Sequence, residues 1–517
     1  MPPPSLLKGG GLSSPALLGL LVATAAAMLF AAKPSRGKPL PANVTPVPFL
    51  PSTPLLGNTL ELAANAARLQ DWVADRSREC DGQPFVVQLL GKRNLVYLSR
   101  PEHFEQVLKL QSSNFNKGLA IHDIYSDFMG ESILLVNGDR WKYHRRVLVN
   151  LFSARALRDF MTPIIQKNIL VLMDILARAR ERNEALDIHK LMNKFTFETF
   201  AKIGFGQKLG NLVSPEDHPF ERAFDEAHHI TGHRMTTPTW LWKLKRWLNV
   251  GSERKLRECV EVMDSLVMGI ISDAIAKRQQ RGQEEEAGEH DHEKDIPSEV
   301  RSIALLSLIA GRDTTANAVS WILHMLHEHP RVEEKLRAEL YEKLPKLATS
   351  RDYMPSLEEL QDLPYLEAVI NENLRLLPIF PYTSRQCIRD TVFPDGTFIQ
   401  AGEVLGLPHY VMARLTSVWG ENAAEFVPER FLDAKSGEVL DLPVATSSAF
   451  GAGPRICVGR RLASMEMKLL LACIVGRYHL VELPGQTVRY KLALSLTMKD
   501  PLMVNVQHVN QALAKSA

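Results

Sequence analysis

This chain of 517 amino acids contains one highly specific stretch, Phe450-Gly451-Ala452-Gly453-Pro454-Arg455-Ile456-Cys457-Val458-Gly459. The stretch places one cysteine two residues after Arg455 and directly before a predicted helix over Arg461 to Arg477. Its glycines let the backbone approach a flat ligand, and the N–H groups at the start of the helix are expected to lower the pKa of Cys457. Haem iron accepts such a thiolate as its axial ligand. The pattern therefore predicts that Cys457 binds the iron of a haem and that Arg455 reaches one haem propionate.

The remaining cysteines show no comparable pattern. Cys80, Cys259, Cys387 and Cys473 are scattered and are expected to be inert, buried side chains. Five cysteines in total, with no CxxC pair, are too few for a disulfide framework and favour a reducing compartment.

A second motif, Ala310-Gly311-Arg312-Asp313-Thr314-Thr315, lies midway along a long predicted helix from Pro297 to His329. Glycine in a helix interior costs up to about 1 kcal/mol, so some gain should offset it. We expect a local bulge at Gly311 that makes room for dioxygen, with Asp313 and Thr314 as an acid–alcohol pair for proton delivery. The alternative is an ordinary helix that tolerates one glycine and in which the threonine bonds back to its own turn.

Two further pairs lie at helical spacing. Glu372 and Arg375 are three residues apart and can form an ion pair, and Arg430 follows in Pro428-Glu429-Arg430-Phe431. Trp141 and Arg145 are four apart, so an indole N–H and a guanidinium can both bind one carboxylate. Taken alone, either pair is common on protein surfaces.

In this order and spacing, the four motifs resemble those of the cytochrome P450 family, and the resemblance covers nearly everything after Pro39. It implies a single, mainly α, triangular fold with a small β-rich lobe and haem b (heme b) between the two long helices. By resemblance, the haem site comprises the iron ligand Cys457, the loop residues Phe450, Gly451 and Gly459, and the propionate-binding residues Arg455, Trp141, Arg145 and Arg385. Glu372, Arg375 and Arg430 would form a structural network that locks the fold around the haem loop.

Several segments resemble those of the eukaryotic fatty-acid hydroxylases within this family. They are Asn114-Phe115-Asn116-Lys117-Gly118, Ala310 to Thr314, Pro394-Asp395-Gly396 and Val411-Met412-Ala413-Arg414. The resemblance implies a monooxygenase of lipid metabolism that inserts one atom of O2 into a long-chain fatty acid at or near its terminal carbon. Asn116 and Ala413 depart from the usual residues. A sterol, terpenoid, alkane or xenobiotic substrate therefore stays open, as does a non-oxygenating isomerase or haem sensor, against which the Asp313–Thr314 pair argues.

The N-terminal residues 1–32 are expected to form a membrane anchor. Pro15 to Ala32 is a largely apolar run of 18 residues, about 27 Å long as a helix. Lys33, Arg36 and Lys38 follow it, which predicts a single-pass protein of the endoplasmic reticulum with its catalytic part in the cytoplasm. A cleaved signal peptide is the alternative. We expect residues 33–57 to be a basic, proline-rich linker and residues 58–517 to be the haem-thiolate domain.

Apolar periodicity predicts the main elements. Hydrophobic residues make up 45% of the chain and the formal net charge is +2, which is typical of a globular protein and gives no reason to expect nucleic acid. The acidic run from Arg281 to Asp295 reads as a solvated loop. Further helices are predicted over 163–180, 191–203, 256–276 and 364–377, and strands over 86–90, 95–98, 392–393, 397–398 and from 489 to the C-terminus.

The sequence lacks a flavin or nicotinamide fingerprint, so electrons from NADPH should come from a separate protein. The family resemblance implies NADPH–cytochrome P450 reductase, with cytochrome b5 as a further candidate. A basic docking patch is expected from Lys142, Arg145, Arg146, Arg460, Arg461 and Lys468. Residues 240–247 hold three Trp and three cations, which predicts an interfacial helix at the membrane, with a buried helix as the alternative.

Overall fold

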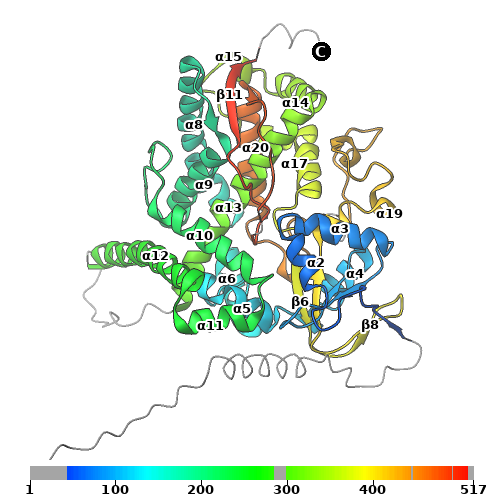
Figure 1. Cartoon of the computed structure of the whole chain (residues 1–517). Helices are drawn as coiled ribbons and strands as arrows, with labels where there is room; N and C mark the ends of the chain where they lie inside the picture. Colours follow the sequence, from blue (N-terminus) through cyan, green and yellow to red (C-terminus); the bar gives the residue numbers. More distant parts are fainter. Residues whose placement is uncertain (1–43, 284–297, 444–445, 447, 492, 510–517) are drawn as a thin grey trace, which may run out of the picture.

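The computed structural model describes residues 44–283, 298–443, 446, 448–491 and 493–509. The predicted anchor, the first part of the predicted linker and most of the acidic run lie outside these residues. Helices dominate, and a small region of strands lies beside them, at the lower right of Figure 1. This arrangement confirms the expected mainly α fold with a small β-rich lobe.

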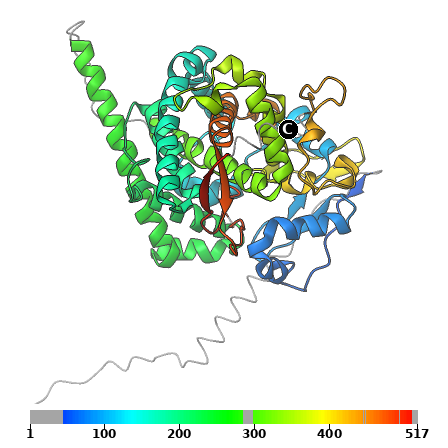
Figure 2. The same cartoon turned by 90° about the horizontal axis from the view of Figure 1, so that it is seen from above.

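The long helix α13 (Ser298–Glu328) organises the helical region. It has 31 residues and therefore spans about 46 Å. It packs most extensively against α9 (Ile188–Phe205) and also contacts α12 (Gly251–Gln283), α17 (Pro364–Leu376) and α20 (Arg460–Val475). Seen from above, α12 extends away along one edge of the molecule (Figure 2). The helix ends before Pro330, whose ring cannot continue it and which opens α14 (Pro330–Lys343) instead.

The predicted helices are confirmed to within a few residues at each end, except that α12 begins five residues before and ends seven residues after the predicted 256–276. Several shorter helices complete the set. The other helices are α2 (Thr59–Ala64), α3 (Leu69–Glu79), α4 (Pro101–Glu105), α5 (Gly118–Met129), α6 (Gly138–Leu151), α7 (Ala154–Ala156), α8 (Thr162–Arg182), α10 (Pro219–Arg234), α11 (Thr239–Leu248), α15 (Lys346–Thr349), α16 (Leu357–Gln361), α18 (His409–Met412) and α19 (Thr416–Trp419).

One described segment, Ala154–Arg182, is long and apolar enough to cross a membrane. It contains α8, whose side chains Ile165, Ile169 and Leu172 are fully buried in the main hydrophobic core. Its apolar character is therefore accounted for by packing inside the protein, as in the core helix of a large domain.

The largest sheet has five strands in the order β2-β3-β9-β6-β4. β3 and β9 run parallel, with Leu95 opposite Val404, and the other neighbours are antiparallel. Smaller sheets have the orders β1-β8-β7 and β10-β11-β5. The strands are β1 (Thr45–Pro46), β2 (Phe85–Val87), β3 (Leu95–Tyr97), β4 (Phe115–Asn116), β5 (Leu186–Asp187), β6 (Thr383–Cys387), β7 (Thr391–Val392), β8 (Thr397–Ile399), β9 (Val404–Leu407), β10 (Tyr478–Glu482) and β11 (Met503–His508).

The predicted strands at residues 86–98 and 392–398 form two antiparallel pairs, and the strand predicted from residue 489 onward is confirmed only over β11. Among the described residues after Arg489, β11 is the only strand, and Tyr490 and Met498 form an isolated antiparallel bridge before it. β11 pairs with β10, which the pattern did not predict. The residues before β11 form a loop directed at the interior instead. The indole N–H of Trp321 donates to the carbonyl of Leu496 at 2.7 Å and holds this loop on α13.

Candidate active site

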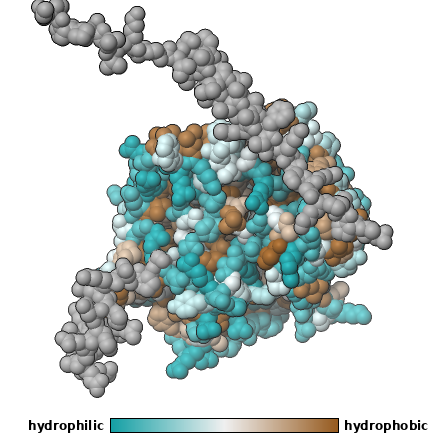
Figure 3. All heavy atoms as spheres, turned by 90° about the horizontal axis from the view of Figure 1, so that it is seen from below, coloured by the Kyte–Doolittle hydropathy of each residue, from teal (hydrophilic) through white to brown (hydrophobic). Residues whose placement is uncertain are grey.

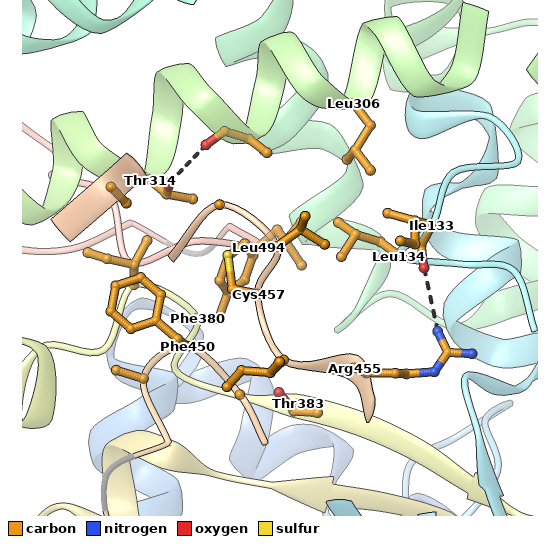
Figure 4. A pocket seen from close by; sticks show the side chains of 18 of the residues that line it. Ile133, Leu134, Leu306, Thr314, Phe380, Thr383, Phe450, Arg455, Cys457 and Leu494 are labelled. Carbon is orange, nitrogen blue, oxygen red and sulfur yellow. Dashed lines mark hydrogen bonds between the residues drawn. The ribbon is translucent and has the colours of Figure 1, made fainter. Parts of the chain in front are cut away.

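A cavity of about 370 Å³ lies between α13 and the loop that precedes α20. Cys457 lies on the loop side and Thr314 on the α13 side, with apolar side chains between them (Figure 4). The apolar lining includes Ile121, Ile133, Leu134, Leu306, Phe380 and Leu494. The cavity therefore presents a sulfur on one wall and a mostly hydrocarbon surface on the other.

The loop that carries Cys457 is shaped by its glycines. Gly451 and Gly453 have φ of +74° and +62°, a region that only glycine adopts readily. A Cβ on Gly453 would lie 2.0 Å from the carbonyl oxygen of Leu108, so the loop could not pack against that segment with any larger residue. The N–H of Cys457 donates to the carbonyl of Phe450 at 2.9 Å and closes the loop.

The expected lowering of the Cys457 pKa is wrong for the protein alone. Burial raises the pKa of the thiol, and this outweighs the backbone N–H groups of Gly459 and Arg460 and the charge of Arg145. The side chain is nevertheless exposed to the cavity, although the surrounding protein shields it from bulk water. The helix start thus acts in the expected direction, but desolvation is the larger effect.

Cationic side chains gather at the other end of the cavity without carboxylate partners. Arg385 is 6% exposed, and its guanidinium donates to a single described group, the carbonyl of Ser384, at 2.8 Å. Burial and the neighbouring Arg455 lower the pKa of Arg385 to about 9, and burial and Arg145 lower the pKa of Arg455 to about 10. Buried cations that depress one another's pKa lack an anion.

Three of the predicted residues meet in one stack. The guanidinium of Arg455 lies 4.8 Å from the ring centroid of Trp141, and that of Arg145 lies 6.0 Å from it. Arg145 Nη1 donates to the carbonyl of Ile456 at 2.7 Å, which ties α6 to the cysteine loop. Trp141, Arg145, Arg385 and Arg455 all line the cavity, as do Phe450, Gly451 and Gly459.

Lys117 joins this cluster, although sequence reasoning did not identify it as a site residue. It lines the same cavity, and burial together with Arg385 and Arg455 lowers its pKa well below the usual value. Its position in Asn114-Phe115-Asn116-Lys117-Gly118, which resembled the family, was the available signal.

These residues fit a haem b. The donor set offers one thiol that faces the cavity and a cluster of buried and half-buried cations without an anion, which suits an iron with two propionates. The fit rests on the cluster's missing negative charge and not on the shape of the cavity alone. Cys457 would hold the iron, and Trp141, Arg145, Arg385 and Arg455 would hold the propionates.

On the opposite wall, the expected bulge at Gly311 is wrong. α13 is regular α-helix throughout, and a Cβ on Gly311 would lie 1.9 Å from the ring of Phe200. The glycine therefore allows α9 to approach α13 closely. This close packing offsets the unfavourable effect of a glycine on helix stability. Thr314 Oγ1 donates to the carbonyl of Ala310 at 2.8 Å, so the hydroxyl bonds back to its own turn. Asp313 is buried beside it.

Glu372 is fully buried and lies at the centre of an ion network. It accepts hydrogen bonds from Arg375 at 2.6 and 2.8 Å and from Arg430 Nε at 3.0 Å. The N–H of Val427 donates to the same carboxylate at 2.7 Å. The network therefore joins α17 to the segment that contains Arg430, and it lies outside the cavity lining.

The expected basic patch loses one member. Lys468 is buried, and its ammonium donates to Glu367 at 2.7 Å and to the carbonyl of Leu360 at 3.2 Å. Its face of α20 packs on α16, so Lys468 is not available to a docking partner. Arg145 is half-buried against the cavity, and the exposed cations are Lys142, Arg146, Arg460 and Arg461.

The fold is mainly α, a cysteine loop lies across the cavity from a central helix, and cations without carboxylate partners surround the cavity. This is the arrangement of a haem-thiolate oxidoreductase. The Cytochrome P450 sequence profile matches residues 47–506. Cytochrome P450 94A1 of Vicia sativa is 30% identical over 84% of this chain and 86% of its own. Cytochrome P450 704B1 of Arabidopsis thaliana is 31% identical over 88% and 93%, and Cytochrome P450 86B1 of the same plant is 30% identical over 90% and 88%.

The chain belongs to the cytochrome P450 family and is a monooxygenase. Enzymes of this family hold a haem iron through a cysteine thiolate and act on lipophilic substrates with electrons from a redox partner.

Proposed function

We propose that this monooxygenase hydroxylates a long-chain fatty acid at or near its terminal carbon. The observation that carries the proposal is the apolar wall opposite Cys457, where Leu306, Phe380 and Leu494 line the cavity. Such a wall suits an alkyl chain, since burying a CH2 group is worth about 0.8 kcal/mol. The segments that resemble fatty-acid hydroxylases support this class of chain over other apolar molecules.

In this proposal each residue has one task. The haem, when bound through Cys457, supplies the chemistry that activates dioxygen and places one oxygen atom in a C–H bond. Arg145, Arg385 and Arg455 neutralise its propionates and orient it. Asp313 and Thr314 deliver protons to the part of the cavity beside α13, where dioxygen would bind. This delivery requires the Thr314 hydroxyl to leave its hydrogen bond to the Ala310 carbonyl.

To test the substrate, the purified ferric protein is titrated with long-chain fatty acids and with sterols. The position of the Soret absorption band is measured at each step. A blue shift with fatty acids, together with a terminally hydroxylated product, is the expected result. A shift with sterols or terpenoids alone would overturn the fatty-acid proposal and keep the monooxygenase. The Cys457→Ala variant is the matched control and should lose the thiolate spectrum while keeping the fold.

We assign electron delivery to NADPH–cytochrome P450 reductase, which would dock on the exposed cations Lys142, Arg146, Arg460 and Arg461. Reversing two of them, as in Arg146→Glu with Arg461→Glu, should raise the reductase concentration for half-maximal rate several-fold, because rim charges steer association. Reversal of the exposed Arg254 on α12 is the control. An unchanged requirement in the double variant would refute the docking face.

We also place the enzyme at the endoplasmic reticulum membrane, with α11 in contact with lipid. Trp240, Leu244 and Trp247 are 53%, 45% and 80% exposed, whereas Trp242 is buried against Arg234. Figure 3 shows the lower side of the molecule, where α5 and α11 lie in Figure 1 and apolar side chains stand among hydrophilic ones. Trp240→Ser with Trp247→Ser should weaken vesicle binding of protein that lacks residues 1–38, and unchanged binding would contradict the contact.

A further inference from the structure

A second, small cavity lies behind the α13 wall, next to the large one. Its volume is about 20 Å³, and its lining includes Asp313, Thr314, His228 and Ser495. On this measure one water molecule needs about 10–15 Å³ and two to four polar partners. The remaining lining is apolar and comes mainly from Phe128, Phe224, Leu306 and Phe380. The cavity therefore has room for one water, and its mainly apolar surface has a small polar part.

One of these polar groups lacks a partner among the described residues, and another accepts no hydrogen bond from them at its carboxylate. Ser495 is 2% exposed, and its hydroxyl oxygen is buried without a hydrogen-bond partner. Asp313 is 6% exposed, and no described residue donates a hydrogen bond to its carboxylate. The neighbouring Arg312 attracts this carboxylate through its charge, but its guanidinium donates to Asp225 at 3.0 Å and lies 3.6 Å from Glu221, so it gives Asp313 no hydrogen bond. Buried polar groups in native proteins are almost always satisfied by protein or by ordered water.

His228 on α10 is held rigidly at the edge of the same cavity. Its Nε2 accepts the backbone N–H groups of Leu494 at 2.9 Å and Ser495 at 3.3 Å. Burial lowers the pKa of His228 although Asp313 opposes the shift, so the ring is neutral at pH 7. An imidazole that accepts at Nε2 carries its proton on Nδ1, which leaves Nδ1–H as a donor. The rings of Phe128 and Phe224 lie 6.3 and 5.3 Å from it and restrict its rotation.

We propose that the small cavity binds one structural water, held by Ser495 Oγ and His228 Nδ1–H, that donates to the Asp313 carboxylate and keeps it directed toward Thr314. His228 and Ser495 are then positioning residues that act through this water. His228 does not itself pass a proton, because its Nε2 is occupied by two backbone donors. The loop before β11 carries Leu494, which lies at the large cavity with Thr314 (Figure 4), and the water would couple this loop to the proton pathway.

The inference rests on the proposed role of Asp313 and is tested with two variants of different design. Ser495→Ala removes one partner of the water and leaves the loop backbone in place. His228→Gln keeps an acceptor for the loop N–H groups and removes the Nδ1–H donor. Ser320→Ala is the matched control, since Ser320 is a buried serine of α13 whose hydroxyl bonds its own turn at Ala316.

The first measurement is a crystal structure of the haem-loaded protein at a resolution that shows waters. It should show one water within hydrogen-bond distance of Asp313 and Ser495, and that water should be missing in Ser495→Ala. The second is the fraction of NADPH electrons recovered in hydroxylated product and not in hydrogen peroxide. This fraction should fall roughly 3- to 10-fold in both variants, the factor expected for one hydrogen bond. The ferric spectrum and the substrate-induced spectral shift should stay as in wild type.

A dry cavity in the wild-type crystal would overturn the inference, and so would unchanged coupling in both Ser495→Ala and His228→Gln. Asp313→Asn separates this failure from failure of the proposed function. If Asp313→Asn lowers coupling and the other two variants do not, only the water site is refuted. If Asp313→Asn also leaves coupling unchanged, the proposed role of the acid–alcohol pair falls with it.

Discussion

Two clusters of buried arginines in this protein differ in their partners. Around Glu372, Arg375 and Arg430 are paired with one carboxylate, and the remaining donors of Arg375 reach backbone carbonyls, including that of Ala423 at 2.7 Å. Around the large cavity, Arg385 has one backbone acceptor and lies beside other cations. A buried cation paired with a carboxylate belongs to the fold, whereas a buried cation without a carboxylate marks the place of an anionic ligand. The missing carboxylate thus distinguishes Arg385 from Arg375 and Arg430 without reference to sequence motifs.

The paired cluster should give the largest effect when it is broken. Glu372→Gln leaves two guanidinium groups buried without a carboxylate, which typically costs about 3–5 kcal/mol. We expect a large drop in the urea midpoint of unfolding and little folded protein at 37 °C, as seen by circular dichroism and by the yield of haem-loaded protein. A variant that unfolds within the error of wild type would show that the network is not structural.

Removing Arg385 from the unpaired cluster should stabilise the haem-free protein and weaken haem binding in the haem-loaded protein. Arg385→Leu removes a buried, unpartnered charge and should stabilise the haem-free protein against urea. The same variant should lose haem roughly 10- to 100-fold faster to an apomyoglobin trap, because a charge-assisted hydrogen bond contributes about 1.5–3 kcal/mol. A loss of stability in both forms would place Arg385 with the structural arginines instead.

Most of the fold could be predicted because helical periodicity and prolines mark the helices directly. The long helix α13, its end before Pro330 and the start of α20 after the cysteine loop follow from local sequence. The strand β10 and the loop before β11 could not be predicted, because their conformation depends on distant partners. The loop is held by Trp321 and by His228, which lie far away in the chain.

The site was predictable in its residues but not in its energetics. Cys457, Arg455, Trp141, Arg145 and Arg385 were identified from motifs, and the structure brings all of them to one cavity. The role of Gly311 was misjudged because spacing does not reveal that Phe200 packs on that position. The direction of the Cys457 pKa was misjudged because burial depends on the whole fold. Lys117 was missed although its segment resembled the family, because the resemblance assigned no chemistry to it, and His228 was missed because it belongs to no such segment.

Glu466 is a buried carboxylic acid without a cationic partner among the described residues, the opposite case to the unpaired arginines. It lines the large cavity, and burial raises its pKa to about 8 despite a hydrogen bond from Thr315. Between the ordinary pKa near 4.5 and the raised value, the folded protein binds the extra proton, so stability falls as pH rises. We expect wild type to lose about 2 kcal/mol relative to Glu466→Gln between pH 6 and 8. Parallel stability curves for the two proteins would show that Glu466 is ionised throughout.

Glu429 offers the same pairing as Glu372 at the surface and should show the smallest effect. It accepts from Arg331 at 2.7 Å and from Lys335 at 3.1 Å, and these cations lower its pKa to about 2 although burial opposes them. These ion pairs contribute to the free energy of unfolding at pH values above the ordinary pKa of glutamate. The contribution is lost as the pH falls below that value. Because both cations are half-exposed or more, we expect Glu429→Gln to cost less than about 1 kcal/mol at pH 7 and less still in high salt. If Glu429→Gln costs as much as Glu372→Gln, the number of cations around a carboxylate, and not its burial, sets the stability of these networks.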